Sequence, residues 1–112
     1  MSALSEKLRK ARTLTVELGE IKLAVLRPTP FEYHEKLRGE SPAKGLASLI
    51  VGWEGVSELF LTGSGTPHPA PFDQDAATEW LFDHPEAFRK VMDAVVEGYA
   101  AYVNRKEEAA KN

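Results

Sequence analysis

The side chains best suited to bind a metal ion or to move protons near neutral pH are the three histidines, His34, His68 and His84. None lies at the short spacing from another that zinc-binding histidines show, and the chain contains no cysteine that could complete a metal site. We therefore expect surface or helix-capping histidines, and neither a metal nor a cofactor.

Other catalytic patterns are missing from the sequence as well. It has no G-x-S-x-G elbow, no Walker phosphate loop and no dinucleotide fingerprint, and the Gly-Ser-Gly at residues 63–65 is short and lacks a following lysine. Asp73 and Asp75 could form an acid/base pair, but the helix dipole already explains acidic residues at the start of a helix. We therefore expect that the protein is not an enzyme.

Charge is unevenly distributed along the chain, although the net charge is only −3. Residues 1–52 hold nine Lys/Arg and six Asp/Glu, residues 53–97 hold two and nine, and residues 98–112 hold three and two. Nucleic-acid binding depends on clustered positive charge, so the acidic second half argues against a nucleic-acid partner. The basic N-terminal arm, residues 1–12, is expected to be a solvated terminus.

Alternating apolar and polar residues predict a β-hairpin over residues 13–26. A two-residue type II′ turn that begins at Gly19 places the apolar side chains of both strands on one face and sets Glu17 opposite Lys22. The expected apolar pairs are Leu18 with Ile21, Val16 with Leu23, and Leu14 with Val25. A lone hairpin is marginal in water, so helices must cover this face, and pairing between copies in a homo-oligomer would cover the hairpin edges.

A mainly helical body is predicted over residues 29–104. Thr29 and Glu32 form a capping box around Pro30, and the helix that they start ends at Gly39. A second helix starts at Ser41-Pro42.

The apolar spacing of residues 46–53 extends this second helix as far as Trp53. Trp53 would then lie on the apolar stripe of that helix. Gly52 and Gly55 flank it near the expected helix end, where glycine permits the left-handed conformation that closes a helix.

Glycine and proline mark residues 62–71 as a loop. Residues 57–61, just before the loop, predict a short strand, and Asp73 caps a short helix after it. A long amphipathic helix begins at Pro85, and the polar tail 105–112 is expected to fray. The expected fold is a single α+β domain: an N-terminal β-hairpin packed on a small helical body with a long C-terminal helix. No apolar run approaches the roughly 20 residues of a membrane span.

Aromatic residues are the remaining candidates for function. Trp80 and Phe88 are expected in the core, whereas Phe60 and Phe72 lie next to the loop and are candidates for exposure. Exposed aromatic side chains rimmed by acidic residues would make a protein-binding surface.

A seven-position motif joins the end of the predicted second helix to the start of the next one. It consists of Gly52, Trp53, Gly55, Val56, Pro71, Phe72 and Asp73. With the strand pair before it and the amphipathic helix after it, this pattern resembles the small tail assembly chaperones of tailed bacteriophages and prophages, over about residues 12–104.

The resemblance implies a non-enzymatic helper of tail morphogenesis that works in the bacterial cytoplasm and is absent from the finished virion. Its expected partners are the tape-measure protein, which it would keep soluble, and the tail-tube protein. The candidate protein-binding residues are the seven motif positions together with Phe60. We expect Trp53 to be a structural pivot that fixes the loop and the hairpin as the contact surface.

Two alternatives belong to other classes of protein. One is a phage structural or completion protein that stays in the virion, which mass spectrometry of purified particles would detect. The other is a bacterial adaptor domain that binds one protein through the hairpin edge. A very long downstream reading frame, with a frameshift site near the stop codon, would favour the phage chaperone over the adaptor.

Overall fold

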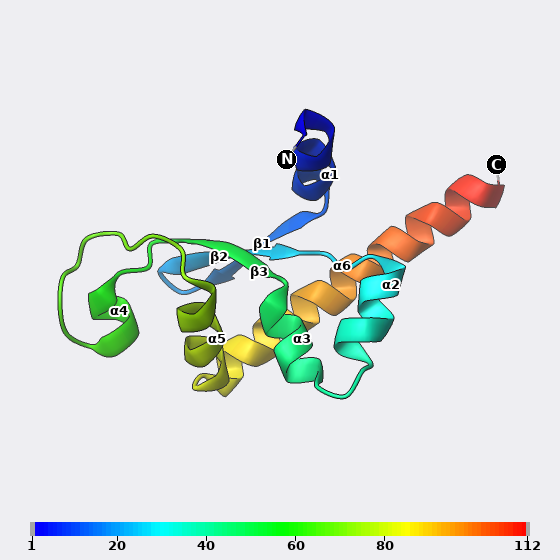
Figure 1. The fold of residues 1–112 in the computed structure, drawn as a ribbon. Helices are drawn as coiled ribbons and strands as arrows, with labels where there is room; N and C mark the ends of the chain where they lie inside the picture. Colours follow the sequence, from blue (N-terminus) through cyan, green and yellow to red (C-terminus); the bar gives the residue numbers. More distant parts are fainter. Residues whose placement is uncertain (1, 112) are drawn as a thin grey trace.

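A three-stranded antiparallel sheet with helices packed beneath it forms the centre of the molecule (Figure 1). The computed structural model describes residues 2–111 and has the expected α+β architecture. Its elements are α1 (Ala3–Ala11), β1 (Thr13–Leu18), β2 (Ile21–Leu26), α2 (Pro30–Glu32), the π-helix η1 (Tyr33–Leu37), α3 (Pro42–Ser48), β3 (Ile50–Glu54), α4 (Glu58–Thr62), α5 (Gln74–Phe82) and α6 (Pro85–Lys111).

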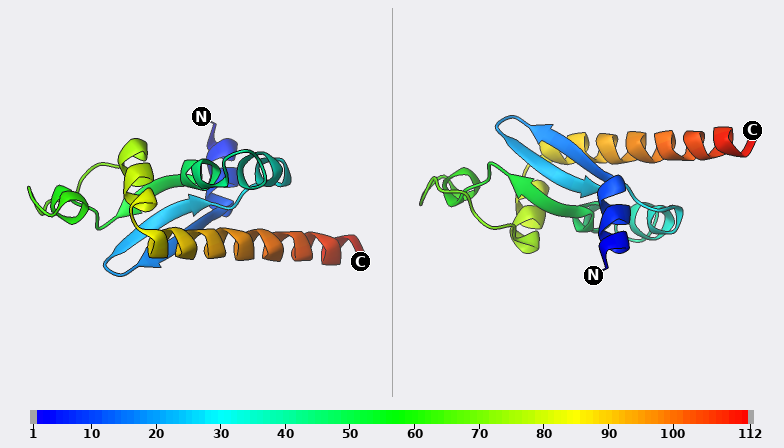
Figure 2. Two further views of the ribbon diagram at one scale, coloured as in Figure 1. Left: turned by 90° about the horizontal axis from the view of Figure 1, so that it is seen from below. Right: turned by 90° about the horizontal axis from the view of Figure 1, so that it is seen from above.

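The layers are one-sided. Figure 1 shows α2, α3, α5 and the first turns of α6 below the sheet, with α1 rising from the other side, and α4 and its loop at one end of the molecule. Figure 2 shows α6 running along the strands and continuing past them to the C-terminal end. The core between the layers combines strand and helix side chains, including Ile21, Val25, Leu46, Leu81 and Val91, each at most 1% exposed.

The predicted hairpin is confirmed in register. β1 and β2 pair antiparallel with Leu18 opposite Ile21, and the other predicted pairs follow from that register. Gly19 has φ of +63°, the positive value that the first residue of a type II′ turn requires. Lys22 Nζ lies 3.9 Å from Glu17 Oε1 on the exposed face, as the register predicts.

The second predicted helix ends earlier than expected, and placing Trp53 on its stripe is wrong. α3 ends at Ser48, and Ile50–Glu54 forms β3, which pairs antiparallel with β2 so that Trp53 lies opposite Leu23. The β-branched side chains of Ile50 and Val51 favour a strand. Pairing with β3 also satisfies the backbone groups along the free edge of β2, a long-range effect that helical spacing does not reveal.

The short strand predicted over residues 57–61 is also wrong, because this segment is the helix α4. The Ser57 side chain accepts a hydrogen bond from the Phe60 backbone N–H, which caps the helix start, and Gly63 ends the helix with φ of +78°. The cap and the terminal glycine outweigh the strand preference of the apolar run between them.

The remaining predicted helices begin where the sequence indicates, but the one that starts at Pro30 is a three-residue α2 followed by the π-helix η1, and it ends at Leu37 rather than at Gly39. Thr29 and Glu32 form the predicted capping box, and Asp73 caps α5. The helix α6 continues through 105–111, where a frayed tail was expected. Its last turns are rich in Lys, Glu and Ala, which are strong helix formers. Met1 and Asn112, at the ends of the predicted arm and tail, lie outside the described residues.

Candidate protein-binding surfaces

The motif residues gather where β3 leaves the sheet and the loop before α5 returns to it. Trp53 Nε1 donates a hydrogen bond of 2.8 Å to the carbonyl oxygen of Ala70. The rings of Trp53 and Phe72 meet edge to face, with centroids 5.2 Å apart. Both rings pack against the core. Trp53 therefore ties the end of β3 to the loop, rather than joining a helix end to the hairpin as the sequence suggests.

The other motif positions have structural roles at the same junction. Val56 is 2% exposed, and its carbonyl oxygen accepts a hydrogen bond of 2.8 Å from Ala70 N–H. Gly55 has φ of +81°, and a Cβ there would lie 2.9 Å from the carbonyl oxygen of Glu20, so only glycine fits. Asp73 caps α5 through Ala76 N–H at 3.0 Å.

Gly52 and Pro71 complete the motif without such constraints. A Cβ on Gly52 would lie 3.5 Å from the Ala24 Cβ, an ordinary contact, and Pro71 is exposed. The structure therefore explains most of the motif by local folding. Contact of the motif with a partner stays a prediction.

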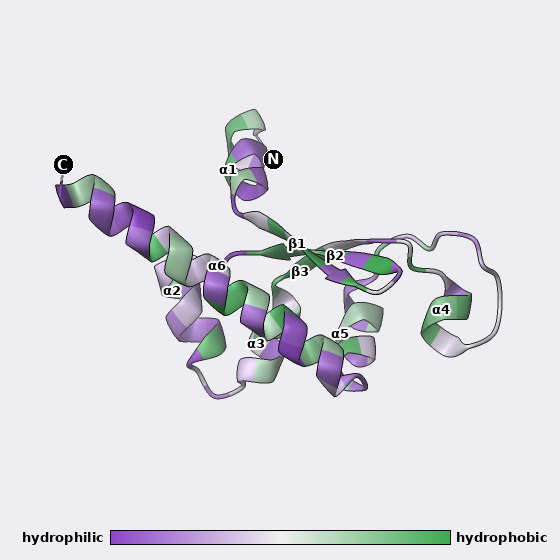
Figure 3. Cartoon of the chain, turned by 180° about the vertical axis from the view of Figure 1, so that it is seen from behind, coloured by the Kyte–Doolittle hydropathy of each residue, from purple (hydrophilic) through white to green (hydrophobic). Residues whose placement is uncertain are grey.

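A second feature at this end of the molecule is an aromatic surface shared by α4 and α5. Leu59 and Phe60 on α4 are 42% and 36% exposed, and Figure 3 shows α4 as largely hydrophobic. The Phe60 ring lies 5.6 Å from the ring of Trp80 on α5, which stacks on His84 at 4.4 Å. A cavity of about 260 Å³ between the two helices is lined by Leu61, Thr62, Ala76, Glu79, Trp80, Asp83 and His84. We call Leu59, Phe60 and these lining residues the α4–α5 surface.

The α4–α5 surface lies within a long segment that lacks positive charge. Between Lys44 and Arg89 the sequence contains seven Asp/Glu and no Lys or Arg. Two of these acidic residues, Glu79 and Asp83, line the cavity itself. An exposed aromatic side chain beside acidic residues, as predicted from the sequence, is therefore present at Phe60, whereas Phe72 is partly buried and packs against the core.

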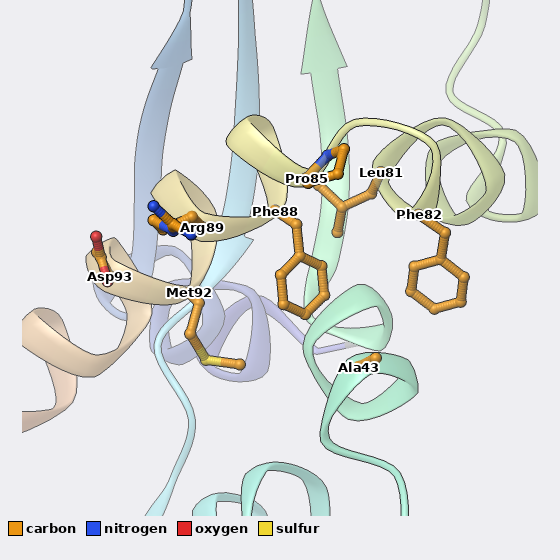
Figure 4. Close-up of a pocket in the computed structure, with 8 residues that line it drawn as sticks. All are labelled: Ala43, Leu81, Phe82, Pro85, Phe88, Arg89, Met92 and Asp93. Atoms are coloured by element: carbon orange, nitrogen blue, oxygen red, sulfur yellow. The ribbon is translucent and has the colours of Figure 1, made fainter.

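A larger hollow lies on the other side of α5, between α3, α5 and α6 (Figure 4). Its volume is about 520 Å³, and its lining is Ala43, Leu81, Phe82, Pro85, Phe88, Arg89, Met92 and Asp93. Phe82 is 44% exposed. In Figure 4, Phe82, Phe88 and Met92 point into the same space above Ala43, with Arg89 and Asp93 at one side. We call this hollow the α3–α5–α6 groove.

The sequence did not predict this groove. Phe88 and Met92 belong to the apolar stripe of α6, and a stripe predicts only that its residues face other apolar residues. They pack against the core and also line the groove, because α3 and α5 leave part of the stripe uncovered. The signal in the sequence was Phe82, which directly precedes the break between two helices, where a large side chain has few neighbours within its own helix.

No family model matches the sequence, and no solved structure matches the fold. Within residues 2–111, no helix is both long and apolar enough to cross a membrane. Over the same residues, no group of three or more His, Asp or Glu side chains is placed to hold a metal ion.

Proposed function

We propose that this protein is a phage tail assembly chaperone that holds an apolar helix of the tape-measure protein in the α3–α5–α6 groove and helps to recruit tail-tube subunits. The observation that carries the proposal is the groove itself, a concave apolar surface with an exposed aromatic side chain at its edge. The motif around Trp53 and Phe72, with its resemblance to the tail assembly chaperones, directs the choice of partner.

The groove has the chemistry that receives an amphipathic helix. Such helices bind by placing apolar side chains at positions i, i+3, i+4 and i+7 into a hydrophobic groove. Phe82 and Met92 offer adaptable apolar contacts, since aromatic residues and methionine are enriched at binding surfaces. Arg89 and Asp93 carry opposite charges beside this floor and can orient polar groups on the helix.

The shallow groove and the net negative charge of the molecule suit a temporary complex. A tape-measure protein exposes long apolar helix faces before tube subunits surround it, so its chaperone must cover these faces and then release them. A shallow groove covers only part of a helix, and interfaces of small area generally belong to transient complexes. Net negative charge helps to keep the chaperone and its client dispersed.

The test is capture of the tagged protein from cells that assemble tails, with mass spectrometry of the bound partners. The informative variant is Phe82→Asp, which places a charge at the groove edge on a side chain that is already 44% exposed. Phe31→Asp is the matched control, because Phe31 is 77% exposed and does not line the groove. We expect the wild type and Phe31→Asp to recover the tape-measure protein. The amount that Phe82→Asp recovers should be at least about ten-fold lower, as for an interface hot spot.

Two results would contradict the proposal. One is recovery of neither the tape-measure nor the tail-tube protein by the wild type. The other is equal recovery by wild type and Phe82→Asp, which would remove the groove from the mechanism. Mass spectrometry of purified virions separates the chaperone, expected to be absent, from a completion protein that remains in the particle.

A further inference from the structure

The helix α1 displays an apolar pair that none of residues 2–111 covers. Leu4 and Leu8 are 74% and 71% exposed, and none of the residues that the structure describes in α1 is buried. Side chains four residues apart lie on the same face of a helix. Lys7, Arg9 and Lys10 surround this pair, against a single acidic residue in the helix, Glu6. α1 is therefore a short, basic, amphipathic helix with an unpartnered apolar face.

The base of α1 is anchored, so that this face is held away from the body. Arg12 Nη1 donates hydrogen bonds of 2.9 Å to the carbonyl oxygen of Arg27 and 2.7 Å to Glu32 Oε1. The Arg27 N–H donates to the Arg12 carbonyl oxygen at 2.7 Å, and Thr13 Oγ1 donates to the Arg9 carbonyl oxygen at 2.7 Å. These contacts fix the C-terminal end of α1 at the sheet, and Figure 1 shows the rest of the helix rising from it.

The α4–α5 surface is complementary to α1 in both polarity and charge. It exposes Leu59 and Phe60, and Glu79 and Asp83 line its cavity. The chain contributes no Lys or Arg from residues 45–88, so this surface attracts a basic helix without internal competition. The α3–α5–α6 groove is a poorer match for α1, because its lining includes Arg89.

We propose that α1 of one copy docks on the α4–α5 surface of a second copy, with Leu4 and Leu8 against the exposed Leu59 and Phe60, and with the α1 lysines near Glu79 and Asp83. The contact is between copies because α1 and α4 are held apart within one chain. Figure 1 shows α1 on the far side of the sheet, and the hydrogen bonds of Arg12 hold its base there.

Each α1 contact joins two different parts of the chain. Two copies that exchange α1 helices reciprocally would close into a two-fold symmetric dimer, and copies that do not would form a larger ring or chain through heterologous contacts. One nine-residue helix covers far less than the roughly 1,600 Å² of a standard interface, so we expect a dissociation constant of about 10⁻⁵ to 10⁻⁴ M. Association is expected to weaken several-fold in about 0.5 M salt, because screening reduces the attraction between exposed charges.

Sedimentation velocity of the purified full chain, over a concentration series, measures this association directly. We expect a species heavier than the 12.4 kDa monomer at high concentration. Leu8→Asp should shift the transition to at least ten-fold higher concentration. Phe31→Asp makes the same exchange at another exposed apolar position and should associate like the wild type. A wild type that stays monomeric throughout, or a Leu8→Asp variant that associates normally, would overturn the proposal.

A charge exchange identifies the receiving surface. The double variants Lys7→Glu/Lys10→Glu and Glu79→Lys/Asp83→Lys change exposed side chains only, and each should associate weakly alone. Mixed in equal amounts, they pair a negative α1 with a positive α4–α5 surface, and association should recover. Loss in Leu8→Asp without recovery in the mixture would show that α1 docks elsewhere, which contradicts the proposed surface.

This inference is independent of the client. The sedimentation experiment contains only this chain, and its variants leave the α3–α5–α6 groove unchanged. A failed tape-measure capture therefore leaves the self-association result standing, and the reverse also holds.

Discussion

Two of the exposed apolar surfaces, the α3–α5–α6 groove and the α4–α5 surface, lie on opposite sides of the short helix α5, and they differ in shape and charge. The α3–α5–α6 groove is the larger hollow, about 520 Å³ against 260 Å³, and its lining contains one basic and one acidic side chain. The α4–α5 surface combines protruding apolar side chains on α4 with two acidic groups and no Lys or Arg. Burial of apolar area would dominate binding in the groove, whereas charge would contribute more on the α4–α5 surface.

The contacts that hold the two surfaces in place also differ. The α4–α5 surface depends on contacts distant in sequence, because Trp53 and Phe72 hold the loop that separates α4 from α5. The groove depends on close packing of α3, which rests on η1, and of α6 against α5. Each surface can therefore be disturbed by a substitution that does not touch it.

The largest expected effect is that of Trp53→Ala on the α4–α5 surface. The substitution removes the edge-to-face contact with Phe72 and the hydrogen bond to Ala70. We expect a loss of about 2–4 kcal/mol in the free energy of unfolding, below the value for a fully buried tryptophan because Trp53 is only half-buried. Urea denaturation measures the loss, and hydrogen exchange should show it first at residues 57–72.

Trp53→Phe is the companion variant. It keeps a smaller ring against Phe72 and removes the hydrogen bond to Ala70, so a loss of about 1–2 kcal/mol is expected, less than for Trp53→Ala. Unchanged stability and unchanged client capture in Trp53→Ala would together rule out the pivot role of this tryptophan.

The second largest effect is expected for Gly45→Ala in α3, a helix that forms one wall of the α3–α5–α6 groove. A Cβ at this position would collide with the backbone carbonyl of Lys36 in η1, which cannot move as a flexible side chain can. Gly45→Ala should displace α3, and with it the Ala43 wall of the groove, at about 1–3 kcal/mol. Gly52→Ala is the control, since its Cβ would make only an ordinary contact and should change stability by less than about 1 kcal/mol. Equal losses in the two variants would mean that α3 adapts to the added methyl group.

The fold could be predicted from the sequence where local signals and tertiary contacts agree. The hairpin register follows from alternation, Gly19 and the Glu17–Lys22 pair, and the helix starts at Thr29 and Asp73 follow from side-chain caps. The prediction failed at residues 50–54, where helical spacing of apolar residues was preserved but the edge of β2 supplied a partner for a strand. Edge pairing depends on which segments meet in space, so one-dimensional periodicity does not contain it.

The candidate surfaces, like the fold, could be predicted from the sequence only in part. Exposure of Phe60 near acidic residues could be inferred from its place beside a glycine-rich loop. The groove could not, because its lining comes from three helices whose packing angles are not encoded in the local pattern. The exposed face of α1 was not predicted either. The many charged residues of the segment 1–12 favoured a solvated terminus, although Leu4 and Leu8 have the four-residue spacing of one helix face.

The smallest expected effect tests the support of α1, the proposed partner of the α4–α5 surface. Burial alone would raise the pKa of the Glu32 carboxyl, but the hydrogen bond from Thr29 N–H and the nearby Arg12 guanidinium outweigh burial and hold that pKa below its ordinary value. A lowered pKa in the folded state means that ionised Glu32 stabilises the fold above the ordinary pKa. This contribution is lost as the pH falls through the folded pKa.

Glu32→Gln keeps a side chain that can complete the capping box and removes only the charge opposite Arg12. We expect a loss of about 1 kcal/mol in the free energy of unfolding at neutral pH, and a difference from the wild type that shrinks as the pH falls through the folded pKa of Glu32. Urea titrations of both proteins at neutral pH and over a series of falling acidic pH values measure this difference, in which the other carboxyl groups cancel. A difference that persists undiminished at low pH would mean that the charge of Glu32 is not what holds Arg12. If Arg12 stays in place without that charge, Glu32→Gln should self-associate like the wild type. If Arg12 is freed, α1 should become loose and self-association should weaken.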